Sequence, residues 1–259
     1  MRRLTTSRYV VLVLRFGLAP VLLAALVGCG ARSSAAPVAA APAAHAVTST
    51  RSGTSRSAAG VAIDRRIARD AQLRRSDFPA GWGPSRRPAA TPGLKCPTVS
   101  EARAAVSARG ASREFAQGNA SSAAATADSV TYIYADTATA AHWFARLTSR
   151  GTQACLVRVL RKSVIAQIRG QGARLDSITA RPLTIAPAGD ERAAERVVVR
   201  LSAGTFSGKA EADVMFVRAR RAVAVLVVNR VGGPFDPALE TKLVRTVSDR
   251  LAAGLAGAG

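Results

Sequence analysis

The sequence predicts an α+β fold, in which an antiparallel sheet of about five strands packs with helices and a last helix lies across it. Three observations indicate this fold. Strand-like segments separated by turn residues fill residues 175–231, and apolar residues at helical spacing precede them in residues 137–168. The dipeptide Asp236-Pro237 then opens a further apolar stripe, which is typical of a helix start. We therefore expect a single domain over residues 61–255.

The first part of this domain is expected to be mostly helical. One helix is predicted over residues 62–74, another over residues 98–108, and a short strand over residues 113–117. Between the helices, glycines and prolines interrupt the segment "SDFPAGWGPSRRPAATPGLKCP". Phe78 and Trp82 in this segment are expected to close one end of the core. A ligand-stacking role for Trp82 is the alternative.

A strand and a helix follow in the middle of the chain. The stretch "SVTYIYA" alternates and is rich in β-forming residues, which predicts a strand over residues 128–135. Asp136 or Thr137 is expected to cap a helix that ends at Gly151. His142 lies beside the apolar face of this helix and is expected to be a partly buried packing residue. That face consists of Ala140, Trp143, Phe144 and Leu147.

The next helix is predicted to be amphipathic, with Thr152 as its cap. Its apolar positions, at helical spacing, are Leu156, Val159, Leu160, Val164 and Ile168. Its other face is basic and carries Arg158, Arg161, Lys162 and Arg169. A row of this kind is usually a solvated face, and an anion-binding patch is the alternative interpretation.

Four strands are then predicted, over residues 175–185, 194–203, 207–218 and 222–231. If the second and third pair around Gly204, Arg196 and Arg200 face Glu211 and Asp213 across the sheet, which sets the register. The fourth, "AVAVLVVN", does not alternate and is expected to be a central strand covered on both faces. The stripe of the closing helix consists of Leu239, Leu243, Val244, Val247 and Leu251.

The chain is strongly basic, with a formal net charge of +21 in 259 residues. Such a charge favours anionic partners, whether anionic lipid, an acidic wall polymer or nucleic acid. The sequence contains no nucleic-acid recognition motif and no aromatic residues interleaved with the arginines, so we expect no specific nucleic-acid partner. A small ligand is the further candidate partner.

Catalytic signatures are missing from the sequence. It contains no GxSxG, HExxH, GxxxxGK[ST] or GxGxxG motif. One histidine, His142, lies in the predicted domain, and the acidic residues do not cluster. We therefore expect a non-enzymatic protein without a metal or cofactor. A hydrolase of unknown class that uses His142 is the alternative.

The N-terminus has the pattern of an export signal. Four arginines and no acid lie in the first fifteen residues, and a thirteen-residue uncharged run ends in Leu26-Val27-Gly28-Cys29. This tetrapeptide resembles the bacterial lipobox, which implies that residues 1–28 are removed and that Cys29 receives a lipid. A conventional secretory leader or an uncleaved anchor are the alternatives. All three place the domain outside the cytoplasm, and the lipobox interpretation places it on the outer face of the cell membrane. Whether export is general or twin-arginine stays open.

Residues 29–60 are predicted to be a tether between the membrane and the domain. They are rich in alanine, proline and serine and cannot form a core. A flexible chain of this length spans on the order of 30 Å. His45 lies in this segment and is expected to be a solvated residue.

The remaining two cysteines, Cys96 and Cys155, are expected to form a disulfide, because the domain is predicted to be exported. Two buried free thiols are the alternative. Neither cysteine has the spacing of a metal site.

The element order, with a strand before the helix "TATAAHWFARL", a cysteine just beyond it, a meander and a closing helix, resembles two related groups of proteins. These are the surface lipoproteins of high-GC Gram-positive-type bacteria and the PknH-like extracellular sensor domains of bacterial serine/threonine kinases. The sensor domains commonly have two disulfides, whereas this chain offers one pair of cysteines. The resemblance implies a fold and a location, and no binding residues.

The leading functional hypothesis is therefore a lipid-anchored, extracytoplasmic binding or sensor-like domain. Its candidate ligand-binding residues are Trp82, Arg158, Arg161 and Lys162. The alternative is a basic structural module that docks on anionic lipid or on a cell-wall polymer.

Overall fold

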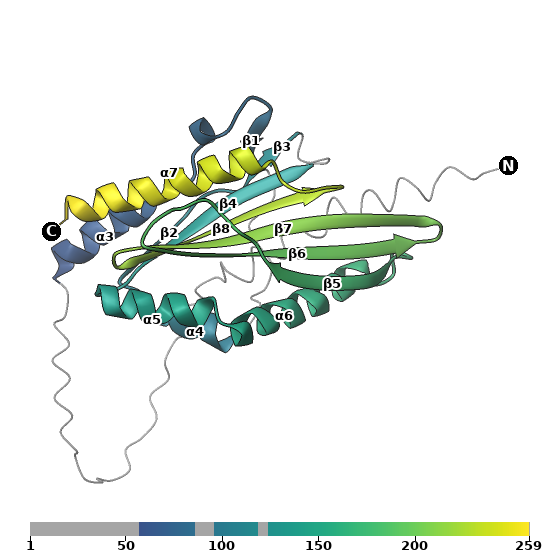
Figure 1. Cartoon of the computed structure of the whole chain (residues 1–259), viewed down its shortest axis with the longest axis horizontal. Coiled ribbons are helices and arrows are strands. Elements are labelled where there is room, and N and C mark those ends of the chain that lie inside the picture. Colours follow the sequence, from purple (N-terminus) through teal and green to yellow (C-terminus); the bar gives the residue numbers. More distant parts are fainter. Residues whose placement is uncertain (1–56, 86–95, 119–123, 259) are drawn as a thin grey trace, which may run out of the picture.

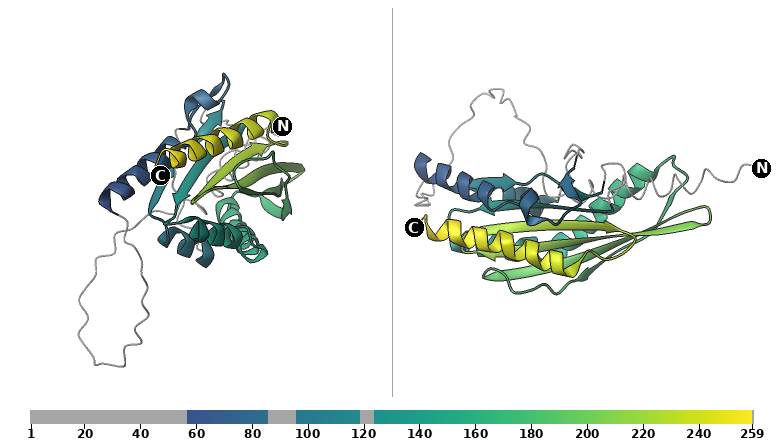
Figure 2. Two further views of the ribbon diagram at one scale, coloured as in Figure 1. Left: turned by 60° about the vertical axis from the view of Figure 1, so that its left-hand side comes forward. Right: turned by 90° about the horizontal axis from the view of Figure 1, so that it is seen from above.

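The computed structural model describes residues 57–85, 96–118 and 124–258. They form three layers: an eight-stranded sheet with helices on both of its faces (Figures 1 and 2). The predicted α+β class is confirmed. The predicted leader, the lipidation site Cys29 and most of the tether, including His45, lie outside the described residues.

The described helices are α3 (Ala58–Asp70), the short 3₁₀ helix η1 (Arg75–Asp77), α4 (Pro97–Ala104), α5 (Thr137–Leu147), α6 (Arg150–Ile168) and α7 (Pro237–Ala256). The strands are β1 (Trp82–Pro84), β2 (Ala108–Ala111), β3 (Phe115–Gln117), β4 (Ala125–Ile133), β5 (Arg174–Pro182), β6 (Glu191–Ala203), β7 (Phe206–Ala219) and β8 (Ala222–Val231).

All strand pairs are antiparallel, and the order across the sheet is β1-β3-β4-β8-β7-β6-β5. Strand β2 pairs with the second half of β4, next to the part that β3 covers. The meander from β5 to β8 is confirmed, and β8 lies at the centre with its first eight residues buried. The sheet has more strands than the sequence predicts, because β1 and β2 have only three and four residues and contain glycine.

Each face of the sheet has its own core. Helices α4, α5 and α6 cover one face, on which the β-branched residues of β6 and β8 pack under Phe144, Leu160 and Val164. Helices α3 and α7 cover the other face (Figure 1), where Leu226 and Met215 pack under Leu243. The closing helix α7 therefore lies across the sheet as expected, with its predicted stripe buried.

The capping residues explain where two helices differ from expectation. Helix α3 begins at Ala58 because the Ser57 hydroxyl accepts the Gly60 N–H at 3.2 Å, so the chain is already helical where the tether was expected. Helix α5 is capped by Asp136, which accepts the Thr139 N–H at 2.7 Å. It ends at Leu147 and not at Gly151, because Ser149 already caps the next helix.

The hairpin around Gly204 pairs Ala203 with Phe206 and confirms the predicted pairing of β6 with β7. In this register Arg196 lies opposite Asp213 and donates to both of its carboxylate oxygens, at 2.6 and 2.7 Å. The expectation for Arg200 is wrong, because the same register places it opposite Lys209. Of these two arginines, Arg196 therefore forms an ion pair with the acid that it faces, and Arg200 does not face an acid.

Gly110 allows α3 to lie close to β2, and its replacement tests this packing. A Cβ atom at this position would overlap the carbonyl oxygen of Ala68 in α3, so backbone has to move. We expect Gly110→Ala to lower the free energy of unfolding by about 3 kcal/mol, measured by urea denaturation. Gly151→Ala is the matched control, because its Cβ would meet nothing closer than 4.0 Å and the helix gains stability from alanine. Equal effects of the two changes would refute the close approach.

Candidate ligand-binding groove along helix α6

Helix α6 starts at a tight corner after α5. The Ser149 hydroxyl accepts the Thr152 N–H at 3.3 Å, and the hydroxyls of Ser149 and Thr152 both donate to the carbonyl oxygen of Arg146 at 2.8 Å. The prediction that Thr152 caps this helix is therefore wrong, since the cap lies three residues earlier and Thr152 is buried. These hydrogen bonds set the direction in which α6 leaves α5.

A disulfide joins α6 to α4. Cys96, the residue that precedes α4, bonds to Cys155 in the second turn of α6, with their Cα atoms 6.0 Å apart. The predicted pairing is confirmed, and the alternative of two free thiols is wrong. The first half of α6 is therefore fixed to α5 by the hydrogen bonds at its N-terminus and to α4 by the disulfide.

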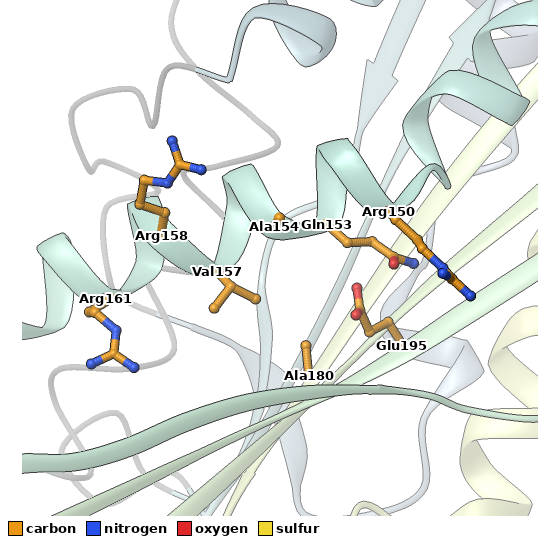
Figure 3. A pocket seen from close by; sticks show the side chains of 8 residues that line it. All are labelled: Arg150, Gln153, Ala154, Val157, Arg158, Arg161, Ala180 and Glu195. Carbon is orange, nitrogen blue, oxygen red and sulfur yellow. The ribbon is translucent and has the colours of Figure 1, made fainter.

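The first three turns of α6 stand over β5 and β6 and leave a groove of about 440 Å³. Its floor includes Ala180 of β5, whose small side chain does not fill the space below the helix (Figure 3). The lining residues are Arg150, Gln153, Ala154, Val157, Arg158, Arg161, Ala180 and Glu195. The groove is thus apolar in part and carries charges of both signs.

Three arginines, Arg150, Arg158 and Arg161, give the groove its positive charge. The last lies eleven positions after the first, which is about 16 Å along a helix. Arg150 lies towards one end of the groove and Arg161 towards the other (Figure 3). None of the three forms an ion pair with a residue in the part of the chain that the structure describes. The absence of any acid in α6 leaves their charge uncompensated along the helix.

Glu195 is the one acid that lines the groove. It projects from β6 on the same face as the buried Val197, towards α6, and lies between the positions of Arg150 and Arg161 (Figure 3). Burial raises the pKa of its carboxyl. Among the described residues it has no ion-pair partner either, although three arginines line the same groove. The groove therefore contains one acid and three arginines that do not form ion pairs with one another.

The structure brings two of the predicted binding residues together and separates the others. Arg158 and Arg161 line the groove, whereas Lys162 is exposed on α6 outside it. Trp82 is only 5% exposed and packs on Phe78 with ring centroids 4.8 Å apart. It belongs to the core on the far face of the sheet, so the ligand-stacking interpretation of Trp82 is not supported by its position.

Sequence reasoning missed Arg150 and Glu195. Arg150 follows the cap Ser149 and lies eight residues before Arg158, which places it on the same helical face. This spacing identifies Arg150 as a residue of the same face once the first residue of the helix is known. Glu195 gave no such signal, because only the packing of α6 against β6 brings it into the groove.

His142 does not have the environment that the sequence suggests. Its side chain is exposed on α5, with its ring at the edge of Trp143 and the centroids 5.2 Å apart. The expectation of partial burial is wrong, because Trp143 lies at the edge of the apolar face of α5 and His142 lies outside that face.

A charged cluster lies on the opposite face of the sheet, under α7. Arg196 bridges Asp213 and Glu211, and the Lys209 ammonium lies 2.6 Å from Glu211. Glu240 in the first turn of α7 hydrogen-bonds to Asp213. Burial and the negative charge of Asp213 raise the pKa of Glu240 to about 7, against the pull of Arg196. Glu240 therefore holds its proton more tightly where α7 meets the sheet.

This cluster makes stability depend on pH. The unfolded chain releases the Glu240 proton near its ordinary pKa of 4.5, whereas the folded chain keeps it up to about pH 7. Folding takes up a proton between these values, so the free energy of unfolding falls as the pH rises through this window, by on the order of 1 kcal/mol after solvent screening. We expect Glu240→Gln to abolish this fall, measured by urea denaturation at pH 4 and pH 8. Glu101→Gln on the exposed surface of α4 is the control, and a fall that persists unchanged in Glu240→Gln would contradict the assignment.

A second buried polar group lies on the α6 side of the sheet, in β4 and β8. Asn229 donates to the Thr126 hydroxyl at 3.1 Å. Asp128 is diagonal to Asn229 on the same face, and burial together with the nearby Glu114 raises its pKa well above the ordinary value. Burial therefore favours the neutral form of this carboxyl.

Another groove, of about 420 Å³, runs between α3 and α7. Ile67 of α3 approaches Gly254 of α7, whose Cβ would lie 3.0 Å from the Ile67 side chain, which explains how closely the two helices pack. Arg250 at this groove is bound to Asp77 at 2.6 Å, so its charge is already paired. Two further arginines, Arg66 and Arg74, line this groove, against three arginines without an ion pair among the described residues in the α6 groove, which is therefore the stronger candidate site.

The fold and the groove define a three-layer α+β domain with a basic surface groove. No family model matches the sequence, and no curated protein matches it. Within the described part of the chain, no group of three or more His, Cys, Asp or Glu residues is placed to hold a metal ion. No described helix combines the length and the hydropathy that a membrane span requires.

Proposed function

We propose that the protein is a lipid-anchored, extracytoplasmic binding module, sensor-like and non-enzymatic, which holds an anionic ligand in the α6 groove. The observation that carries this proposal is the set of three groove arginines without an acidic partner among the described residues. A cation that lacks a partner in the folded protein remains available to an external anion, and arginine is suited to phosphate and carboxylate groups. The corner and the disulfide fix the helix backbone that carries these arginines before a ligand binds.

Binding of anions to the purified full-length chain in mild detergent tests the site. We expect inorganic phosphate and simple phosphate monoesters to bind weakly and to raise the thermal midpoint. A triple variant with alanine at Arg150, Arg158 and Arg161 should lose this effect. The control is a variant with alanine at Lys162 and Arg169, which removes charge from the same helix outside the groove. If the control loses as much binding as the groove variant, the groove is not the site.

Metabolic labelling with a fatty-acid analogue tests the anchor. We expect label on the wild-type chain and none on Cys29→Ala, which should also leave the membrane fraction. If the variant stays in the membrane fraction as tightly as the wild-type chain, the lipoprotein hypothesis is wrong.

A second candidate function, docking on anionic lipid, is favoured by one exposed apolar residue. Ile165 is 42% exposed on the outer face of α6, one turn from Arg161, Lys162 and Arg169. Apolar side chains among basic ones are typical of helices that bind anionic membrane surfaces. This candidate predicts binding to anionic vesicles that weakens steeply with salt and that Ile165→Asp abolishes. Binding only to vesicles without anionic lipid would exclude it.

A further inference from the structure

The α6 groove has a distribution of charges that restricts the shape of its ligand. We infer that it takes an extended, hydroxylated chain with an anionic group at each end, namely a segment of a sugar or polyol phosphate. This inference rests on the proposed function and names the ligand class for the same site.

The separation of the arginines argues for two anionic groups. Arg150 and Arg161 are about 16 Å apart along the helix, and Figure 3 shows the Arg150 side chain pointing away from Arg161, so in this arrangement a single phosphate does not contact both. Each guanidinium can bind a phosphate with two parallel hydrogen bonds. Arg158 also lines the groove and lies between them along the helix, but its guanidinium points away from the sheet (Figure 3), so it does not take part in this argument. A ligand with an anionic group at each end can bind both Arg150 and Arg161, whereas a compact anion can bind only one of them.

The part of the groove between Arg150 and Arg161 argues for hydroxyl groups between the two anions. Gln153 lies one helical turn after Arg150, Glu195 lies beside it towards Arg161, and Figure 3 shows the Gln153 amide reaching towards the Glu195 carboxyl. A carboxyl accepts hydrogen bonds from hydroxyl groups, and an amide both donates and accepts. A third phosphate here would meet the Glu195 carboxylate and be repelled. The centre is therefore suited to neutral, hydroxylated parts of a chain.

The floor of the groove is compatible with the carbon backbone of such a chain. Ala154, Val157 and Ala180 offer small apolar surfaces between the polar groups. Sugars and polyols present C–H groups as well as hydroxyls, so they can contact both kinds of lining. A fully apolar linker would leave Glu195 and Gln153 without partners, which is costly for half-buried polar groups.

Four soluble probes separate these features. They are a hexitol with a phosphate at each end, the same hexitol with one phosphate, the free hexitol, and a six-carbon alkanediol with a phosphate at each end. Calorimetry with the full-length chain in mild detergent gives the affinity of each. We expect the hexitol bisphosphate to bind at least tenfold more tightly than the monophosphate and several-fold more tightly than the alkanediol bisphosphate.

Single variants assign the contacts. Arg150→Ala and Arg161→Ala should each weaken the hexitol bisphosphate about tenfold while leaving the monophosphate within about threefold, since it keeps one arginine. Glu195→Ala should remove the preference for the hexitol over the alkanediol, and Glu195→Gln should retain part of it. Lys162→Ala, next to Arg161 but outside the groove, should change neither affinity.

The outcomes separate this inference from the proposed function. Equal affinities for the bisphosphate and the monophosphate would overturn the two-anion ligand and leave a groove that binds single anions. Equal affinities for hexitol and alkanediol bisphosphates in the wild-type chain would overturn the role of Glu195. If Lys162→Ala weakens binding as much as Arg161→Ala, only bulk charge is at work, and both the ligand class and the groove as the site are wrong.

Discussion

Arg221→Ala is expected to lower the free energy of unfolding by about 3–5 kcal/mol, because it leaves a buried carboxylate without its guanidinium. Arg221, just before β8, donates to both oxygens of Asp64 in α3, at 2.5 and 2.9 Å. Asp64 is only 1% exposed, and the Ser107 hydroxyl also donates to it at 2.8 Å. Urea denaturation of the variant and the wild-type chain measures the loss.

An exposed ion pair provides the control for this prediction. Arg69 and Asp70 lie 3.8 Å apart on α3, and both side chains are mostly exposed. We expect Arg69→Ala to cost less than 1 kcal/mol, since surface pairs contribute little. Asp64→Asn in the Arg221→Ala background should recover part of the lost stability, because the buried charge that Arg221 offset is then gone. Similar losses from Arg221→Ala and Arg69→Ala would show that the buried pair does not hold α3 to the sheet.

The Arg221–Asp64 pair also illustrates what the sequence cannot reveal. The two residues are 157 positions apart, and neither belongs to a motif. The same holds for Arg250 and Asp77, which join α7 to η1 across 173 positions. Such contacts depend on how helices pack on the far face of the sheet, and that packing is not encoded in any local period.

Features set by local geometry were predictable. The pairing of Arg196 with Asp213 follows from the turn at Gly204, because a short turn fixes the register of the two strands it joins. The burial of β8 follows from its lack of alternation, since both faces of a central strand need apolar residues. The short strands β1 and β2 were missed because three or four residues carry too little pattern to identify.

In the candidate site, too, some residues follow from local sequence pattern and others only from the tertiary structure. Arg158 and Arg161 were identified because the helical period places them opposite the apolar stripe of α6. Arg150 was missed through the wrong choice of cap, which began the helix at Thr152. Glu195 required the tertiary structure, because its role arises where α6 crosses β6. The charges of the groove therefore come partly from helical periodicity and partly from a contact between distant elements.

Reduction of the Cys96–Cys155 disulfide is expected to lower the free energy of unfolding by about 4 kcal/mol, on the chain-entropy estimate for a loop of this size. The bond spans 59 residues, which include β2, β3, β4 and α5. Without it, the unfolded chain gains conformational freedom while the folded chain keeps most of its contacts. Urea denaturation with and without a phosphine reductant measures the change.

The double variant with alanine at Cys96 and Cys155 should match the reduced wild-type chain and should not respond to the reductant. A response of the double variant would show that the reductant acts elsewhere in the protein. A loss below about 1 kcal/mol in both cases would mean that the bond contributes little to stability.

The same bond is expected to affect the groove more than stability alone explains. Cys155 lies one residue from the groove-lining Ala154 and between Arg150 and Arg158 along α6. Breaking the bond releases this helix from α4, so the two ends of the groove lose their fixed separation. Under conditions where the reduced chain is still folded, we therefore expect it to bind an anion with two charged ends more weakly, while single phosphates bind nearly as before. Equal weakening of both classes would instead indicate that reduction partly unfolds the domain and that the disulfide does not position the arginines.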